Sequence, residues 1–141
     1  MGAHVSVPMY RRSLSQRLRL EGRRCRACGI VQFPPQGACP RCRGTDWRPE
    51  VLSGSGRVVA STFITAQGAP PEFTEQARRT GGYVVALVAL AEGPRVTAQI
   101  VDDDAPLSSG TPVTMVVRRL YDEEGVIRYG FKFRRADEPV P

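Results

Sequence analysis

Four cysteines in two close pairs are the feature that most constrains this chain, and they are all the cysteines it has. The pairs read Cys25-Arg-Ala-Cys28 and, ten residues later, Cys39-Pro-Arg-Cys42. A C-x₂-C pair places two thiolates on one tight turn of the backbone. Two such turns that face each other supply four sulfurs at tetrahedral geometry around Zn²⁺. The sequence therefore predicts a zinc site made of these four side chains.

Three other uses of the cysteines compete with zinc. A redox dithiol at Cys39 and Cys42 needs a strand-to-helix context, whereas Pro34, Pro35 and Gly37 indicate a loop. Two structural disulfides would require an exported protein, and the first residues of the chain lack the apolar core of a signal peptide. An iron centre is chemically compatible with four thiolates and stays open. Zinc is the preferred interpretation because of the ligand type and the spacing.

A zinc ion held by four thiolates has a closed coordination shell, with no place for water or substrate. Its contribution is to folding, on the order of 10–16 kcal/mol for such sites. This matters because segment 25–47 is too short to bury a hydrophobic core by itself. The cysteines thus predict a small rigid module, and by themselves they say nothing about a reaction.

The length and composition are those of a small globular protein. With 141 residues the chain can form one modest domain and a small appendage. It is 41% apolar and 24% charged, which is ordinary for a soluble protein. No stretch approaches the roughly 18 apolar residues of a membrane span. We therefore expect no membrane association and, with reduced cysteines, a cytoplasmic protein.

The net charge of +6 is unevenly distributed. From Arg11 to Arg48 there are ten arginines against Glu21 and Asp46, whereas the remainder of the chain has ten basic and twelve acidic residues. An arginine-rich face attracts the phosphates of nucleic acid, coenzyme A or a nucleotide. The same face could instead meet an acidic protein partner.

The chain before the cysteines is predicted to be a loose arm followed by one helix. Residues 1–9 read as the arm. A short amphipathic helix is expected from Ser13 to Glu21, with Leu14 and Leu18 on one face and Gly22 at its end. The helix has too few apolar residues to be stable alone, so it must pack on the rest of the chain or on a partner.

From Gly56 onward the pattern is entirely that of β-strands. Residues 66–82 read as a polar loop, and Gly125 as the residue with positive φ in a hairpin turn. Five strands with turns between them favour a small closed or partly open barrel, and an OB-fold has that strand count. The strands are expected at residues 58–65, 83–91, 95–101, 113–120 and 127–134.

Two of these strands carry more detailed expectations. Tyr83 to Ala91 is almost continuously apolar, as in a strand buried on both faces. The last strand alternates strictly, with an apolar set predicted to face the core and a polar set on the opposite face. The apolar set is Ile127, Tyr129, Phe131 and Phe133, and the polar set is Arg128, Gly130, Lys132 and Arg134.

Several motifs, in this order and spacing, give the chain a resemblance to a known family. It resembles the acyl-CoA-associated proteins that join an N-terminal helix, a rubredoxin-like zinc ribbon and a C-terminal OB-fold, long labelled only as a domain of unknown function. Arg43 departs from the family pattern, because a glycine usually follows the last cysteine. The motifs are the two cysteine pairs with Gly29 and Pro40, Ser53-Gly54-x-Gly56-x-Val58-x-x-Ser61-Thr62, Tyr83 to Val88 with Glu92-Gly93, and Gly110-Thr111-Pro112-Val113.

The resemblance implies a mainly β protein with an arm and helix at 1–24, a zinc ribbon at 25–50 and a five-stranded OB-fold at 51–137. It also implies an accessory subunit rather than a stand-alone enzyme. Members of the family accompany thiolase-fold enzymes, namely thiolases, acyltransferases and retro-aldol lyases of steroid side-chain breakdown. The expected partner is such an enzyme in a hetero-oligomer, and the expected ligand is an acyl-CoA ester shared with it.

The residues themselves offer no catalytic arrangement. His4 is the one histidine and lies in the arm, so a Ser–His–Asp or Cys–His site would have no usable base. The acidic runs 102–104 and 122–124 read as solvated turns. We therefore predict no catalytic residue, and no residue is assigned to CoA contact.

A second function stays open, namely a module that binds single-stranded nucleic acid. Zinc ribbons and OB-folds both occur in such proteins, and the chain is basic. OB-folds bind single strands with aromatic and basic residues on their second and third strands. Here that region, residues 83–101, contains one aromatic residue, Tyr83, and one basic residue, Arg95. The nucleic-acid function is therefore the less favoured of the two.

Overall fold

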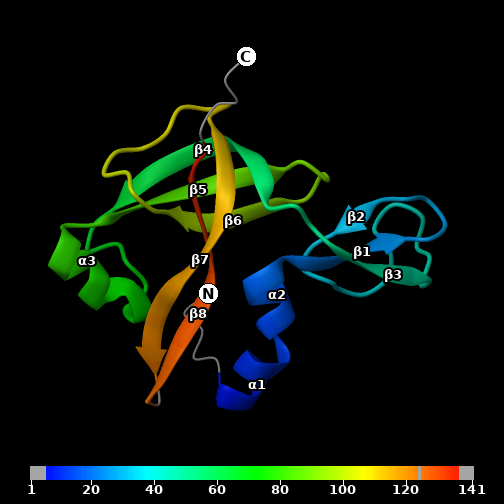
Figure 1. Ribbon diagram of the computed structural model, residues 1–141, viewed down its shortest axis with the longest axis horizontal. Helices are drawn as coiled ribbons and strands as arrows, with labels where there is room; N and C mark the ends of the chain where they lie inside the picture. Colours follow the sequence, from blue (N-terminus) through cyan, green and yellow to red (C-terminus); the bar gives the residue numbers. More distant parts are fainter. Residues whose placement is uncertain (1–5, 124, 137–141) are drawn as a thin grey trace.

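The computed structural model describes residues 6–123 and 125–136. Figure 1 shows a three-stranded sheet on one side of the molecule and a closed five-stranded barrel on the other, with two short N-terminal helices below the junction. The predicted mainly β architecture is therefore confirmed. Within the described residues, no helix combines the length and the hydrophobicity needed to cross a bilayer.

The helix before the ribbon differs from the prediction. There are two short helices, α1 (Val7–Arg12) and α2 (Leu14–Arg19), so helical structure begins inside the segment predicted to be an arm. Ser6 begins α1, because its hydroxyl accepts a hydrogen bond from the Met9 N–H at 3.4 Å. Tyr10, only 7% exposed, anchors this helix to the barrel.

The end of α2 also differs from the prediction. Leu20, not Gly22, ends the helix, with a left-handed φ of 49° and a side chain that is 0% exposed. Burial of the leucine side chain compensates for the unfavourable φ. Gly22 instead lies in a strand, where a Cβ atom would be 2.6 Å from the carbonyl oxygen of Gln32.

The ribbon is a small antiparallel sheet with the strand order β2-β1-β3. Its strands are β1 (Glu21–Cys25), β2 (Val31–Gln32) and β3 (Trp47–Val51). Beyond β2, the ring of Phe33 meets Phe131 of the barrel edge-on at 5.9 Å between centroids. This aromatic contact joins the two bodies. The division of the chain at residues 24 and 50 stays a prediction.

The barrel has the strand order β4-β5-β6-β8-β7 and is closed. Thirteen buried apolar residues form one core cluster, to which Leu20 and Val31 contribute from outside the barrel. The core therefore reaches the N-terminal half of the chain. The strands are β4 (Ser55–Ile64), β5 (Tyr83–Leu90), β6 (Arg95–Ile100), β7 (Pro112–Glu123) and β8 (Val126–Arg135).

The barrel closes through a narrow seam between β6 and β8. These two strands run parallel and pair at Ile100 and Phe133, and the N–H of Val101 donates to the Phe133 carbonyl at 2.8 Å. Strands β7 and β8, by contrast, pair over nearly their whole length, and Gly125 turns between them with the predicted positive φ of 71°. The hairpin therefore extends well beyond the part of the barrel that closes.

The segment 66–82 was predicted to be a loop and contains helical structure. A 3₁₀ turn, η1 (Pro71–Phe73), leads into α3 (Thr74–Thr80), which ends at Gly81 with φ 81°. Only Ala77 of α3 is buried, so the sequence lacks the apolar periodicity that would have indicated a helix. The ring of Phe73 holds the segment in place against Tyr83 and Tyr121.

The last strand contradicts the predicted alternation over half of its length. Phe133 is 0% exposed as expected, but Ile127 and Tyr129 are 38% and 44% exposed, whereas Arg128 is 0% and Lys132 is 6% exposed. The reason is that β8 pairs with β6 of the barrel only near its C-terminal end, at Phe133, so residues 126–130 lie outside the barrel. There η1 and α1 cover the polar face, and the Arg128 guanidinium lies 5.1 Å from the centre of the Tyr10 ring.

Strand β5 was predicted to be buried on both faces. The structure shows one buried face, with Val84, Ala86 and Val88 at 0–1% exposure, and a second face that is half-buried. The second face is partly covered by α3, whose Gln76 side chain donates to Gln99 of the neighbouring strand β6 at 3.0 Å. Two-sided burial is therefore incomplete rather than absent.

Replacing Tyr10 with phenylalanine tests how α1 docks. The Tyr10 hydroxyl accepts a hydrogen bond from the backbone N–H of Tyr129 at 2.8 Å. Tyr10→Phe keeps the ring but leaves that N–H unpaired, so we expect the free energy of unfolding to fall by about 1–3 kcal/mol. Urea unfolding measures the change. Tyr129→Phe, which removes an exposed hydroxyl, is the matched control and should have little effect; equal stability of both variants would contradict the described docking of α1.

Candidate metal centre

The four cysteine sulfurs converge at the end of the ribbon, as the sequence predicts. All four sulfurs lie within 4.8 Å of one another. The Cys25 and Cys42 sulfurs are 3.6 Å apart, and those of Cys28 and Cys39 are 3.5 Å apart. Sulfurs bound to one zinc ion at 2.3 Å in a tetrahedron lie about 3.8 Å from each other. The donor set therefore fits a single zinc ion, which these four side chains would hold.

Backbone hydrogen bonds give the two cysteine turns the same conformation. In the first turn the Gly29 N–H donates to the Cys25 carbonyl at 2.9 Å, and in the second the Arg43 N–H donates to the Cys39 carbonyl at 2.8 Å. The next residue in each turn accepts a bond from the first cysteine's N–H. This pseudo-symmetry aims both pairs of sulfurs at one point.

Arg43 occupies a backbone position that suits glycine. Its φ is 63°, whereas Gly29 at the equivalent position of the first turn has φ 79°. A left-handed conformation costs roughly 1–2 kcal/mol for a residue with a side chain. The departure from the family pattern therefore leaves the turn intact but strained.

Gly44 is a glycine for a different reason, which is space. A Cβ atom at this position would lie 3.2 Å from the Cys42 sulfur and 3.8 Å from the Cys25 sulfur. The backbone passes so close to the sulfurs that a side chain would crowd them. This close approach was not evident from the spacing of the cysteines.

The backbone also favours the thiolate form of Cys39. Burial raises the pKa of this thiol, but hydrogen bonds from the backbone of Cys42 and Arg41 outweigh burial and lower the pKa to about 6. The Cys42 N–H lies 3.5 Å from the Cys39 sulfur. The pKa of Cys42 in the same turn moves the other way: the Gly44 N–H lowers it, but the contact with the Cys25 sulfur and burial raise it to about 12. Thiolates are the form that binds metal, so only Cys39 of this turn is shifted toward the metal-binding form.

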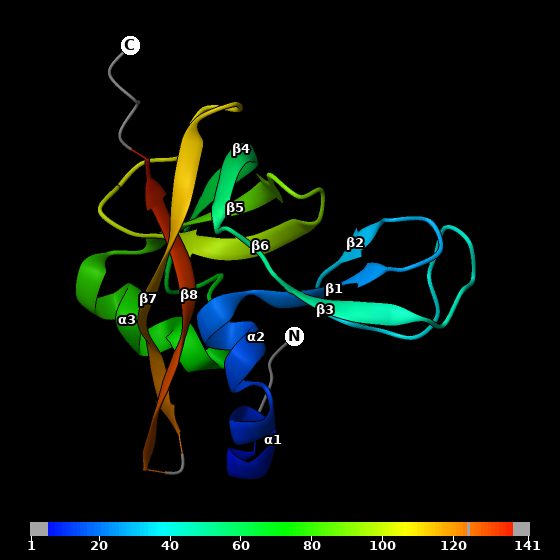
Figure 2. The ribbon, with the colours of Figure 1, turned by 45° about the vertical axis from the view of Figure 1, so that its right-hand side comes forward.

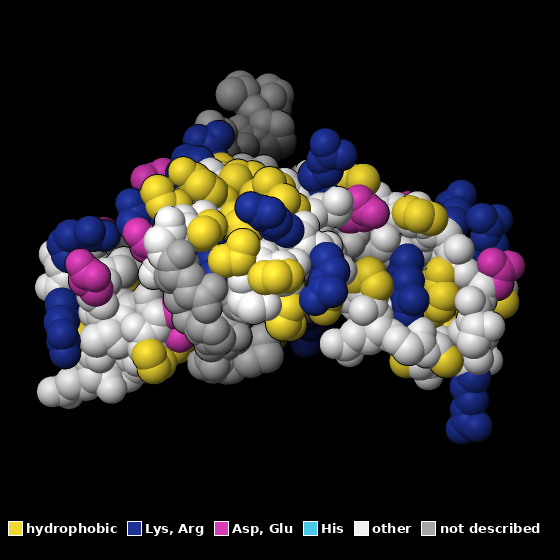
Figure 3. Space-filling model, turned by 90° about the horizontal axis from the view of Figure 1, so that it is seen from below, with side chains coloured by type: hydrophobic (Ala, Val, Ile, Leu, Met, Phe, Trp, Pro, Cys, Tyr) yellow, Lys and Arg dark blue, Asp and Glu magenta, His cyan; other side chains and the backbone are white. Residues whose placement is uncertain are grey.

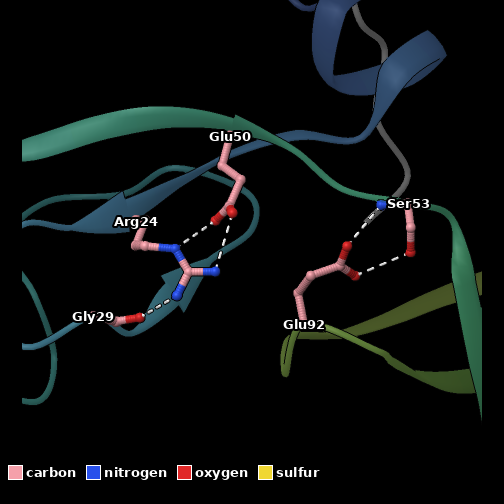
Figure 4. A network of polar contacts seen from close by, with 5 residues as sticks. All are labelled: Arg24, Gly29, Glu50, Ser53 and Glu92. Carbon is pink, nitrogen blue, oxygen red and sulfur yellow. Dashed lines mark hydrogen bonds and ion pairs between the residues drawn. The ribbon is translucent and has the colours of Figure 1, made fainter.

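Several arginines of the basic N-terminal third hold the ribbon together. Arg24 forms a forked pair with the Glu50 carboxylate, with contacts of 2.9 and 3.0 Å, and also donates to the Gly29 carbonyl at 2.8 Å (Figure 4). It therefore links β1, β3 and the first cysteine turn. Arg26 pairs with Asp46 at 3.3 Å. These charges are used within the ribbon.

Arg23 and Trp47 form a second cross-strand contact. The guanidinium lies 3.9 Å from the centre of the indole ring, and its Nε donates to the Gln32 side chain at 2.8 Å. The arginine thus spans all three strands of the ribbon. An open groove of about 350 Å³ beside it is lined by Arg12, Arg48 and the same Trp47.

The connection from ribbon to barrel is fixed by one carboxylate. Glu92, in the turn after β5, accepts hydrogen bonds from the N–H and the hydroxyl of Ser53 at 2.7 and 3.4 Å (Figure 4). Together with the Phe33–Phe131 contact, this carboxylate joins the ribbon to the barrel. In the sequence, Ser53 and Glu92 belong to motifs shared with the family, but nothing in the sequence predicted the contact between them.

The other sequence-predicted features show no catalytic cluster in the described residues. His4 lies outside those residues. Asp103 pairs with Arg135 at 2.9 Å, as expected for a surface turn. Tyr83 is 7% exposed and packs on Phe73, so it is not a stacking platform for nucleic-acid bases.

The burial of Lys132 was not predicted from the sequence, which placed this residue on the polar face of the last strand. Loss of solvent around the ammonium group, and to a lesser extent the positive charge of Arg118, lower the pKa of Lys132.

Comparison with known proteins identifies both parts of the chain. A family model described as "ChsH2, rubredoxin-like zinc ribbon domain" matches residues 15–48, and one described as "ChsH2, C-terminal OB-fold domain" matches residues 49–118. A DUF35 domain-containing scaffold protein of Methanocaldococcus jannaschii is 40% identical over 127 residues, covering 87% of this chain and 86% of that protein. The chain belongs to the DUF35 family. The family resemblance found in the sequence is thereby confirmed.

Two further similar proteins are informative, one by its sequence and one by its solved structure. The benzoylsuccinyl-CoA thiolase subunit BbsA of Thauera aromatica is 27% identical over 117 residues, covering 82% of this chain and 76% of the subunit. A solved structure titled "Ltp2-ChsH2(DUF35) aldolase" contains a chain that superposes with a TM-score of 0.67 at 27% identity. The superposition covers 94% of this chain and 98% of the other. The likeness thus extends over ribbon and barrel together.

The strain at Arg43 predicts a stabilising substitution. Arg43→Gly should raise the free energy of unfolding of the zinc-loaded protein by about 1 kcal/mol, because glycine adopts positive φ without cost. Arg41→Gly, in the same turn but at negative φ, is the control and should be neutral or destabilising. Thermal unfolding at equal zinc loading compares them. A lower stability of Arg43→Gly than of the parent would contradict the assigned backbone conformation.

Proposed function

We propose that this protein is a non-catalytic accessory subunit of a thiolase-fold enzyme that acts on acyl-CoA esters. In this role it supports the partner's active site and shares the binding of the CoA ester. The reaction of the partner is a condensation, a thiolysis or a retro-aldol cleavage. The protein itself contributes a rigid, zinc-stabilised surface.

The observation that carries this proposal is the likeness over the full length of the chain. The match to the chain of the Ltp2-ChsH2(DUF35) aldolase covers ribbon, connection and barrel, not one common module. Relatives named a scaffold protein and a thiolase subunit point to the same kind of role. Because a zinc ribbon or an OB-fold alone occurs with many functions, the combination is more informative than either fold.

We further propose that Cys25, Cys28, Cys39 and Cys42 bind one structural Zn²⁺. Four thiolates close the shell, so the metal would supply folding energy and no Lewis acid or activated water. The short distances among the four sulfurs support this assignment. A reduced four-thiolate site also fits a reducing compartment, and we propose the cytoplasm.

The proposed share in CoA binding is supported by charge. The groove beside Trp47 is lined by three arginines and one carboxylate, namely Arg12, Arg23, Arg48 and Glu21, so its charged side chains are positive on balance. Phosphates are attracted to such an arginine-lined groove, and the indole offers a flat apolar surface. An acidic patch on the partner enzyme would be attracted in the same way.

Binding of single-stranded nucleic acid is the second candidate. The net charge of +6 favours it, but the burial of Tyr83 counts against it. The two functions differ in their response to salt, because binding to phosphate backbones weakens steeply as salt rises.

The proposal is tested by co-purification from cells that carry the native partner genes. We expect a tagged chain to elute with a thiolase-fold enzyme, identified by mass spectrometry, in a fixed ratio that survives moderate salt. Recovery of nucleic acid that is lost as salt rises would favour the second candidate. A chain that elutes alone under all conditions would contradict the accessory role.

Replacing Cys25 or Cys42 with serine tests the metal assignment. Each variant should lose its zinc, as measured by elemental analysis, and the ribbon should unfold because its metal supplies folding energy. Loss of partner binding should follow. Ser53→Ala, which alters the connection but not the sulfurs, is the control and should keep full zinc content. Serine variants that stay folded without zinc and still bind the partner would overturn the assignment.

A further inference from the structure

The outer face of the barrel carries two polar side chains that are almost fully buried. Gln99 of β6 is 8% exposed and Lys132 of β8 is 6% exposed. Each comes one residue before the pair Ile100 and Phe133, where the two parallel strands meet, so the two side chains are neighbours. Ile100 and Phe133 belong to the core, and the alternation of a strand therefore directs Gln99 and Lys132 to the outer face. Their burial comes from the segments that cover this face.

The two buried side chains differ in their partners. Gln76 of α3 donates to the Gln99 side-chain oxygen at 3.0 Å, and the Gln99 amide nitrogen is sealed from solvent without a partner. Among the described residues, the Lys132 ammonium forms no hydrogen bond and no ion pair. Burying an ammonium group without an acceptor is costly. This polar layer therefore has donors left over and too few acceptors.

The Lys132 ammonium is not sealed off but borders a groove between α3 and the β7–β8 hairpin. Figure 2 shows α3 beside these two strands. The groove, which we call the α3 groove, has a volume of about 320 Å³ and is also lined by Gln76, the partner of Gln99. A volume of this size accommodates a small molecule. A ligand in the groove would thus have access to the unpaired cation.

The other charges of the α3 groove indicate what kind of ligand fits. Figure 3 shows acidic and basic side chains side by side at the left end of the molecule, the end where Figure 1 places α3. Three carboxylates and three cations line the groove, so their charges cancel, and apart from Lys132 they are half-buried or exposed and screened by solvent. These six residues are Glu72, Glu75, Asp122, Arg79, Arg119 and Lys132.

Because no lining carboxylate pairs with Lys132 among the described residues, its buried charge is the one that a ligand would compensate. A single negative charge matches a single ammonium group. A phosphate with two charges would be repelled by the lining carboxylates Glu72 and Glu75. Those carboxylates instead accept hydrogen bonds, which favours a ligand that also carries hydroxyl or amino groups.

We propose that the α3 groove binds a small hydroxy- or amino-carboxylic acid, whose carboxylate accepts hydrogen bonds from the Lys132 ammonium. The carboxylate supplies the acceptor that the buried polar layer lacks, and such charge-assisted bonds are strong. The α3 groove shares no lining residue with the arginine-lined groove beside Trp47, so this site is independent of the proposed function. An aspartate or glutamate of a partner protein has the same chemistry, and the experiment separates the two sources.

Lys132 is the only lysine of the chain, so a single isotope label reports on the site. The untagged, zinc-loaded chain with ¹³C at lysine Cε gives one NMR signal. Sodium lactate, with one carboxylate and one hydroxyl, should move this signal in a saturable way with a millimolar or lower dissociation constant. Lactamide, in which a neutral amide replaces the carboxylate, should leave the signal in place, as should sodium chloride at equal ionic strength.

Three results of this titration would overturn the proposal. The first is a signal that lactate does not move at concentrations well above the millimolar range. The second is an equal response to lactate and lactamide, because the carboxylate would then have no role. The third is tighter binding of inorganic phosphate than of lactate, because the groove would then select phosphate rather than a carboxylate.

Replacing Lys132 with methionine tests the role of the ammonium group. Lys132→Met keeps a long unbranched side chain and should weaken lactate binding, measured by calorimetry, by about tenfold or more. Arg134→Met is the matched control, because Arg134 lies two residues further along β8, is exposed and does not line the groove. It should bind lactate within about twofold of the parent. Thermal unfolding establishes that both variants are folded, and unchanged affinity of Lys132→Met would overturn the proposal.

A last comparison separates the free acid from a protein carboxylate. The labelled chain is mixed with the thiolase-fold enzyme recovered by co-purification. If lactate moves the Lys132 signal and the enzyme does not, the free acid is supported as the ligand. If the enzyme moves the signal and lactate does not, the carboxylate belongs to the partner and the small-molecule site is overturned.

Discussion

The convergence of four cysteine sulfurs within 4.8 Å is the constraint on which the rest of this structure depends. The ribbon has three short strands, and among the described residues it contributes Val31 to the main core and packs Phe33 against it. Without a closed metal shell it has too little buried surface to hold a fold. The sulfurs fix the two turns, the first of which joins β1 to β2. Strand β2 leads directly into Phe33, which packs against Phe131 of the barrel.

Arginine has three different tasks in this molecule. In the ribbon, Arg24 and Arg23 bridge strands through a carboxylate and an indole ring. Arg128 is buried beside Tyr10 and helps pack the N-terminal helix on the hairpin. Arg118 and Arg119 are exposed on opposite faces of β7, and among the described residues neither forms an ion pair. A count of basic residues cannot separate these tasks, which is why net charge alone is weak evidence for nucleic-acid binding.

The fold could be predicted well from the sequence where the signal was local. The spacing of the cysteines anticipated the converging sulfurs, and five β patterns with turn residues anticipated the barrel. Segment 66–82 was missed because α3 buries one alanine, too little to produce a helical period. The faces of β8 were assigned wrongly over residues 127–130, although Phe133 is buried as predicted. Alternation separates the two faces of a strand but does not say which face the rest of the chain covers. Tyr10, more than 100 residues away in sequence, decides that.

We have proposed that this chain acts through a partner rather than by itself, and acyl-CoA turnover is the measurement that distinguishes the two. The zinc-loaded chain, its thiolase-fold partner and the mixture of both are assayed with the same acyl-CoA substrates. We expect no turnover by the chain alone, low turnover by the partner alone, and a large gain that saturates at a fixed ratio of the two. Turnover by the isolated chain, or a partner whose rate is unchanged when the chain is added, would show that this protein is not an accessory subunit.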